Sequence, residues 1–173
     1  AHMWFGDLVT LAWWDDFWLN ERFATWMGRK TIISVYPELG GAVHQLEEGL
    51  EIMDRDSSAT VRPIRLPVDP SAVFESTNFM AYPKGQAVLT MFEQYLGEAV
   101  FQQGVQRYID ENKWGNATSE DLWRALESVS GEAISPAMTP YLDQPGVPLS
   151  RRELEGHTRK AEQSRFLIGQ GEV

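Results

Sequence analysis

The sequence predicts a mainly α-helical fold, and two observations carry this prediction. Apolar residues recur every three or four positions along most of the chain, which is the spacing of one helix face. Only the segments 7–10 (DLVT) and 165–168 (RFLI) have the character of β-strands. The chain of 173 residues, 43% hydrophobic and 12% aromatic, is long enough for one domain with a sizeable core.

Two helices are predicted in the first third of the chain. The first follows Asp15 and Asp16, acidic residues that suit a helix N-terminus, and ends at the Tyr36–Pro37 break. Its apolar stripe consists of Leu19, Phe23, Trp26, Met27 and Ile33. The second amphipathic pattern is formed by Leu39, Val43, Leu46, Leu50 and Met53. Residues 56–76 contain three prolines and predict an extended connection.

Four more helices are predicted further along. Pro83 favours the start of a helix that stops at Gly97, with an apolar face of Val88, Met91, Phe92, Tyr95 and Leu96. The next contains Phe101, Val105, Tyr108 and Ile109 and ends near Gly115. Thr118 and Asp121 form a variant of the capping box for a helix with Leu122, Trp123, Leu126 and Val129. Pro136 opens a short helix that closes at Pro145–Gly146.

Composition and charge exclude several classes of function. The chain has no cysteine, which rules out disulfides, thiol catalysis and cysteine-ligated zinc. A formal net charge of −10 argues against nucleic acid as a partner, because phosphate binding requires a basic surface. No apolar run approaches the ~18–20 residues of a membrane span, and no signal-peptide pattern is visible. We therefore expect a soluble chain, and the sequence does not determine its compartment.

Glu21 is the first candidate site residue. On the predicted helix it shares a face with Phe17, Trp18 and small residues, so we expect it to be at least partly buried. A buried carboxylate needs a partner or a metal ion, whereas the alternative is a solvated glutamate on the helix surface.

A metal site would also need histidines, of which the chain has three. His44, beside an apolar stripe, and His157, in the charged tail, are expected to be ordinary residues. His2 precedes Glu21 with 18 residues between them.

Tyr82 is the second candidate. Pro83 disfavours helical backbone at the preceding residue, so we expect Tyr82 at or just before a helix N-terminus. Its hydroxyl either completes the core or donates a hydrogen bond to a developing oxyanion.

Together these segments resemble the aminopeptidase N-like zinc metallopeptidases. In that family a His-Glu-x-x-His motif is followed, 18 residues after its second histidine, by a glutamate within an Asn-Glu-x-Phe-Ala stretch. Here NERFA occupies 20–24, and YPKG at 82–85 is similar to the family's Tyr-x-Lys-Gly. The segments 96–123 and 141–149 also match the downstream pattern, so the resemblance covers about residues 2–149.

The resemblance implies a fold and a set of roles. The fold would be the helical C-terminal portion of a thermolysin-like metallopeptidase catalytic domain. His2 and Glu21 would be zinc ligands, and Tyr82 would be the catalytic residue that stabilises the tetrahedral intermediate. The implied reaction is hydrolysis of N-terminal residues from peptide substrates by zinc-activated water.

The chain also departs from the family pattern. The family's first histidine and general-base glutamate would precede His2 and are not in this sequence, and Arg22 replaces a glycine or small residue. Ala1-His2-Met3 resembles the remnant of a cloning site, in which case His2 is not native. We therefore expect residues 1–149 to be the helical part of a truncated catalytic domain that has no peptidase activity alone and binds zinc weakly or not at all. We expect residues 150–173 to be a frayed tail or the start of a β-rich domain, and the chain to self-associate through apolar surface exposed by truncation.

Two other functions fit the same residues. The chain could be a non-catalytic helical interaction module derived from the same fold, with its N-terminal aromatic residues forming a partner surface. Alternatively, Trp13, Trp14 and Trp18 could stack on a ligand such as a sugar, although tryptophans mostly serve packing.

Overall fold

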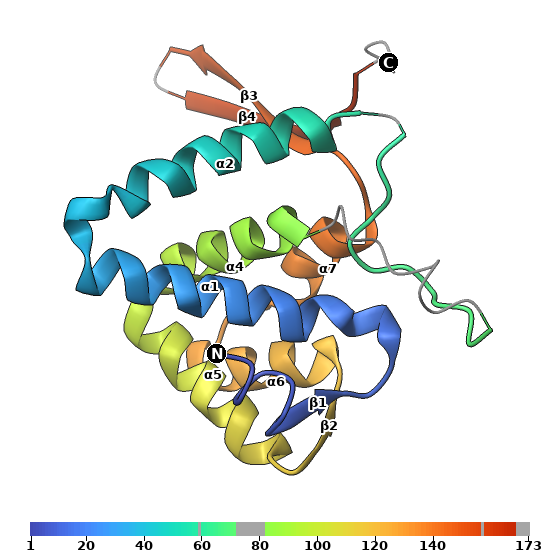
Figure 1. Ribbon diagram of the computed structural model, residues 1–173. Helices are drawn as coiled ribbons and strands as arrows, with labels where there is room; N and C mark the ends of the chain where they lie inside the picture. Colours follow the sequence, from blue (N-terminus) through green and yellow to red (C-terminus); the bar gives the residue numbers. More distant parts are fainter. Residues whose placement is uncertain (59, 72–81, 157, 169–173) are drawn as a thin grey trace.

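A computed structural model describes residues 1–58, 60–71, 82–156 and 158–168, and the side chains of Tyr82 and Pro83 lie outside the described part. The described residues are mainly helical, as predicted (Figure 1). The helices are α1 (Phe17–Val35), α2 (Gly41–Asp56), α4 (Tyr82–Leu96), α5 (Glu98–Asn112), α6 (Ser119–Ser130) and α7 (Ser135–Asp143). The strands are β1 (Val9–Leu11), β2 (Gly115–Ala117), β3 (Val147–Glu155) and β4 (Thr158–Phe166), and the 3-10 turns are Trp14–Asp16 and Pro37–Leu39.

The hydrophobic core lies among α1, α4, α5, α6 and α7. Its fully buried side chains include Leu19, Phe23, Leu89, Phe101, Leu122, Trp123, Leu126, Met138 and Leu142. Helices α5 and α6 approach each other closely at Gly104, where a Cβ atom would lie 2.5 Å from Leu126 Cδ2. Figure 1 shows α1 and α4 in the middle of the molecule, with α5 and α6 on one side and α2 on the other.

Several predicted boundaries are confirmed. Helix α1 ends at Val35, and Gly97 separates α4 from α5 with a backbone φ of +84°. Thr118 and Asp121 form the predicted capping box, in which the Asp121 side chain accepts from the Thr118 backbone N–H at 2.9 Å. Local chemistry at these positions is strong enough to end or begin a helix without help from the rest of the fold.

The predicted apolar face of α4 is partly wrong. Val88 and Phe92 are buried, but Met91 and Tyr95 are exposed. Glu93 takes a buried position instead, accepting hydrogen bonds from Trp26 Nε1 at 3.0 Å and from Lys30 Nζ. The buried face of α4 is therefore shifted from the predicted one. A hydrogen-bonded carboxylate takes the place of an apolar side chain at the contact with α1.

Helix α2 forms where it was predicted, except that Leu39 lies in the 3-10 turn before it, and the apolar stripe stays outside the core. The five stripe residues Leu39, Val43, Leu46, Leu50 and Met53 are between 44% and 65% exposed. A groove of about 460 Å³ lies between α2 and α4 and extends to Val147 and Pro148 at the start of β3.

The strands were predicted less well than the helices. Strand β1 begins two residues after and ends one residue after the predicted DLVT segment, and it pairs in parallel with β2, which was not predicted. β3 and β4 form an antiparallel hairpin that begins at Val147, three residues before the predicted start of the tail. Of the RFLI segment, only Arg165 and Phe166 lie in a strand. None of the helices in the described ranges is long and apolar enough to cross a membrane.

Candidate metal centre

The first eight residues fold back onto α1 and carry His2 to Glu21. Phe5 is buried and stacks on Phe23, with ring centroids 4.5 Å apart and an interplanar angle of 13°. The turn is closed by backbone hydrogen bonds from Asp7 N to His2 O (3.1 Å) and from Leu8 N to Met3 O (3.2 Å). Because Phe5 packs on Phe23, two residues beyond Glu21, the segment before Phe5 reaches the glutamate.

The side chains of His2 and Glu21 lie close together. His2 Nε2 lies 3.8 Å from Glu21 Oε2, and the two side chains are 56% and 31% exposed. Gly6 permits this approach, since its φ is +133° and a Cβ atom there would lie 3.3 Å from His2 O. The prediction that Glu21 is partly buried is therefore correct, and its neighbour is an imidazole.

The chemistry of this pair fits two ligands of a zinc ion. Imidazole nitrogen and carboxylate oxygen are both zinc ligands, and two such atoms on a tetrahedral ion lie about 3.4 Å apart. The observed 3.8 Å between Nε2 and Oε2 is close to that separation. Within the described ranges, no group of three or more His, Cys, Asp or Glu side chains could hold a metal ion. The described residues thus bring together two side chains of the types that bind zinc, whereas a catalytic zinc uses three protein ligands.

Helix α4 begins beside the helix that carries Glu21. It starts at Tyr82, as predicted for this residue, whose side chain lies outside the described part. One turn later, Gly85 packs against Arg22, and a Cβ atom at Gly85 would lie 2.5 Å from Arg22 Cγ. Arg22 directly follows Glu21 and is buried. The segments NERFA and YPKG are therefore neighbours in space, and Arg22, the departure from the family pattern, fills the contact between them.

Lys84 is a residue of this region that the sequence reasoning did not single out. Its Nζ lies 2.8 Å from Asp56 Oδ2 and donates to Gln144 O at 2.9 Å. The motif YPKG includes the lysine, but no local pattern connects it to an aspartate at the end of α2.

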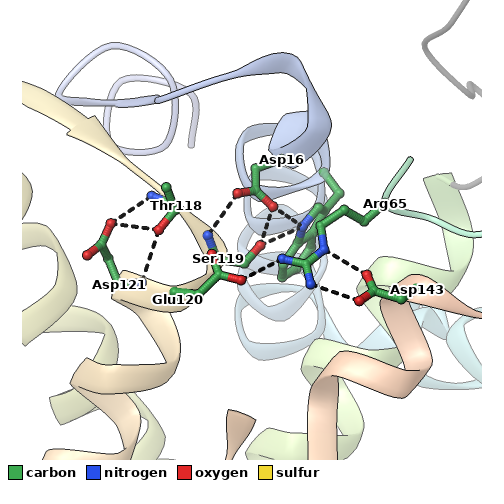
Figure 2. A network of polar contacts seen from close by, with 8 residues as sticks. Asp16, Arg65, Thr118, Ser119, Glu120, Asp121 and Asp143 are labelled. Atoms are coloured by element: carbon green, nitrogen blue, oxygen red, sulfur yellow. Dashed lines mark hydrogen bonds and ion pairs between the residues drawn. The ribbon is translucent and has the colours of Figure 1, made fainter. Parts of the chain in front are cut away.

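A polar network holds the start of α1 against α6 (Figure 2). The carboxylate of Asp16 accepts from Ser119 N at 3.0 Å and from the Ser119 hydroxyl, and Trp18 Nε1 donates to Ser119 Oγ at 3.1 Å. Asp16 was expected to favour its own helix N-terminus, but its side chain does not cap α1 and instead satisfies the N-terminus of α6. Burial raises the pKa of Asp16, against the opposing effect of the Ser119 hydrogen bonds and the Arg65 charge.

Arg65 ties the extended connection to two helices. Its guanidinium binds both carboxylate oxygens of Asp143, at 2.7 and 2.9 Å, and donates to Glu120 at 2.7 Å (Figure 2). The hydrogen bonds to Asp143 raise the pKa of Arg65, so its charge is permanent. Arg65 thereby joins residues 60–71 to the N-terminus of α6 and the C-terminus of α7.

The remaining sequence candidates do not join the site. His44 is exposed and pairs with Glu47, as expected of an ordinary residue, and His157 lies outside the described residues. Trp18 is buried and stacks on Trp123 at 5.7 Å, so it is a core residue. Trp13 and Trp14 remain partly exposed.

These features define a helical domain with a histidine–glutamate pair suited to a metal and a second helix starting beside it. Comparison with known proteins identifies the class: residues 1–141 match the Peptidase family M1 domain. The chain belongs to peptidase family M1, which confirms the resemblance to the aminopeptidase N-like metallopeptidases.

Named relatives agree with this assignment. A leucyl aminopeptidase of Saccharolobus solfataricus is 41% identical over 172 residues, which cover 98% of this chain and 22% of the relative. A probable aminopeptidase 1 of Sulfurisphaera tokodaii is 39% identical, covering 97% of this chain and 22% of the relative. Aminopeptidase M1-C of Oryza sativa subsp. japonica is also 39% identical, covering 97% and 19%. The chain thus spans about a fifth of the length of these relatives.

Proposed function

We propose that the full-length protein containing these residues is a zinc-dependent aminopeptidase that removes N-terminal residues from peptides. The observation that carries this proposal is the convergence of His2 and Glu21, 3.8 Å apart, beside the start of α4. The names of the relatives, which are aminopeptidases, support the same substrate class.

Each residue has a distinct role in this proposal. Glu21 and His2 would hold the metal, and zinc, when bound, supplies a Lewis acid that activates water and polarises the peptide carbonyl. Tyr82 would donate a hydrogen bond to the oxyanion that develops on that carbonyl. The 173 residues alone would bind zinc weakly and have no peptidase activity, because the described residues present two ligands where a catalytic site uses three.

Two substitutions in the full-length protein separate these roles. Glu21→Gln should remove both bound zinc and hydrolysis of an aminoacyl chromogenic substrate, since an amide is a poor zinc ligand. Tyr82→Phe should retain zinc but lower kcat by about 10²- to 10³-fold, the usual effect of losing one oxyanion donor. Tyr95→Phe is a matched control, because it removes an exposed hydroxyl from the same helix.

Metal analysis and the chromogenic assay decide the outcome. A full-length protein without zinc or turnover contradicts the proposed function. Rapid turnover by the 173 residues alone, abolished by a chelator, contradicts only the proposed inactivity of this chain.

The alternative is a non-catalytic interaction module on the same fold. The exposed apolar stripe of α2 favours it, because large exposed apolar patches commonly mark association sites. A full-length protein that neither binds zinc nor hydrolyses aminoacyl substrates would leave this alternative as the better explanation.

A further inference from the structure

We propose that Lys84, through its ion pair with Asp56, is a positioning residue that fixes the first turn of α4 and with it the backbone of Tyr82. This inference rests on the proposed function, in which Tyr82 donates to the oxyanion. Lys84 itself has no ligand role in that function.

One ammonium group joins three elements at this point. Lys84 Nζ lies 2.8 Å from Oδ2 of Asp56, the last residue of α2, and donates to the carbonyl of Gln144, just beyond α7, at 2.9 Å. The side chains of Lys84 and Asp56 are only 11% and 8% exposed. The contact therefore fixes the beginning of α4 relative to the ends of two other helices.

The surroundings of the pair argue that its main effect is on geometry. Lys84 and Asp56 line the groove whose other walls include Leu50, Met53 and Val88. In such apolar surroundings the loss of hydration offsets much of the attraction between the charges, and a well-packed apolar pair can be equally stable. A charged, hydrogen-bonded pair differs from an apolar pair in fixing both distance and direction.

The first turn of α4 is held from its other side as well. Gly85 packs against the stem of Arg22, which directly follows Glu21 on α1. Lys84 thus faces α2 and α7 while Gly85 faces α1. Together the two contacts set where the backbone of Tyr82 lies relative to Glu21.

The test uses kinetics of the full-length protein. Lys84→Met keeps the length of the side chain but removes the charge, and should lower kcat by about 10- to 100-fold while KM changes less than about twofold, because a small misplacement near the reaction is costly. The double variant Lys84→Met/Asp56→Leu should regain thermal stability through an apolar pair but keep the low kcat. Lys30→Met is the matched control, since Lys30 on α1 pairs with Glu93, which lies farther along α4 than Lys84 does.

The possible results have separate meanings. If the double variant regains kcat together with stability, or if Lys84→Met leaves kcat unchanged, the positioning role is overturned. If the unmodified full-length protein shows no aminopeptidase turnover, the proposed function fails. In that case hydrogen exchange of the backbone amides at 86–89 tests the positioning role: faster exchange in the stable double variant supports it, and unchanged exchange overturns it.

Discussion

At the scale of single residues, the pKa values of two aspartates whose side chains bind the N-terminus of α6 are shifted in opposite directions. Burial raises the pKa of Asp16 despite its hydrogen bonds from Ser119. Burial also acts to raise the pKa of Asp121, but hydrogen bonds from Thr118 and Arg124 outweigh it, and the net pKa is lowered. Both carboxylates satisfy N–H groups at the same helix end, so the difference arises from how deeply each is buried.

This difference predicts opposite pH dependence for two substitutions. Because the folded-state pKa of Asp16 is raised above the unfolded value of 3.8, this residue stabilises the fold fully below pH 3.8. That stabilisation is lost as the pH rises through the folded-state pKa. A lowered folded-state pKa makes the Asp121 contribution present above 3.8 and lost as pH falls through the folded pKa. Asp16→Asn should therefore steepen the loss of stability on acidification from pH 7 towards pH 4, and Asp121→Asn should make the further loss below pH 3.8 shallower. Urea denaturation at several pH values measures both slopes, and slopes that change in the same direction would contradict this assignment.

At the scale of elements, the candidate site depends on how α1 and α4 pack. Arg22 departs from the family pattern to which the sequence was compared, and its stem occupies the space beside Gly85. Glycine is otherwise unfavourable within a helix, so the close approach explains why it is tolerated at this position. The two residues form one packing unit even though they are 63 positions apart in the sequence.

The packing unit predicts a coupled mutational effect. With Arg22 present, Gly85→Ala should destabilise the chain by about 1–3 kcal/mol, because the new methyl group would overlap Arg22 Cγ. In the Arg22→Ala background the space is free, and the same change should be neutral or stabilising through higher helix propensity. A double-mutant cycle by urea denaturation measures the coupling, and an equal effect of Gly85→Ala in both backgrounds would show that the two sites are independent.

At the scale of the whole molecule, sequence reasoning worked where the signal is local. The capping box at Thr118 and Asp121 and the glycine at Gly97 end or begin helices by nearest-neighbour chemistry. The meeting of His2 and Glu21 was expected only through the family resemblance, because their approach depends on the stacking of Phe5 on Phe23. β2 has three residues, too few to show a strand period, and the Lys84–Asp56 pair joins segments 28 residues apart. Such long-range contacts leave no trace in a local pattern.

The apolar stripe of α2 shows a related limit and has a consequence for the molecule in solution. Periodicity predicted an amphipathic helix but could not tell what covers its apolar side, which is exposed in the described structure. Within α2 the stripe residues Val43, Leu46, Leu50 and Met53 are spaced by three and four in alternation, the repeat that packs one helix against another, and Leu39 lies in the turn before the helix. In a purified sample, the partner present to cover this stripe is a second copy of the same chain.

We therefore expect the isolated chain to self-associate through α2, weakly at low salt and more strongly as salt increases. The net charge of −10 repels a second copy, and salt screens that repulsion while leaving apolar burial favourable. Leu46→Gln/Leu50→Gln should weaken association about tenfold or more, because both leucines lie within the stripe. The control is Leu154→Gln, which makes the same change at a leucine that is 71% exposed on the β3–β4 hairpin. Sedimentation velocity over a range of protein and salt concentrations measures the result; a chain that stays monomeric throughout, or an equal effect of Leu154→Gln, would show that α2 is not the contact.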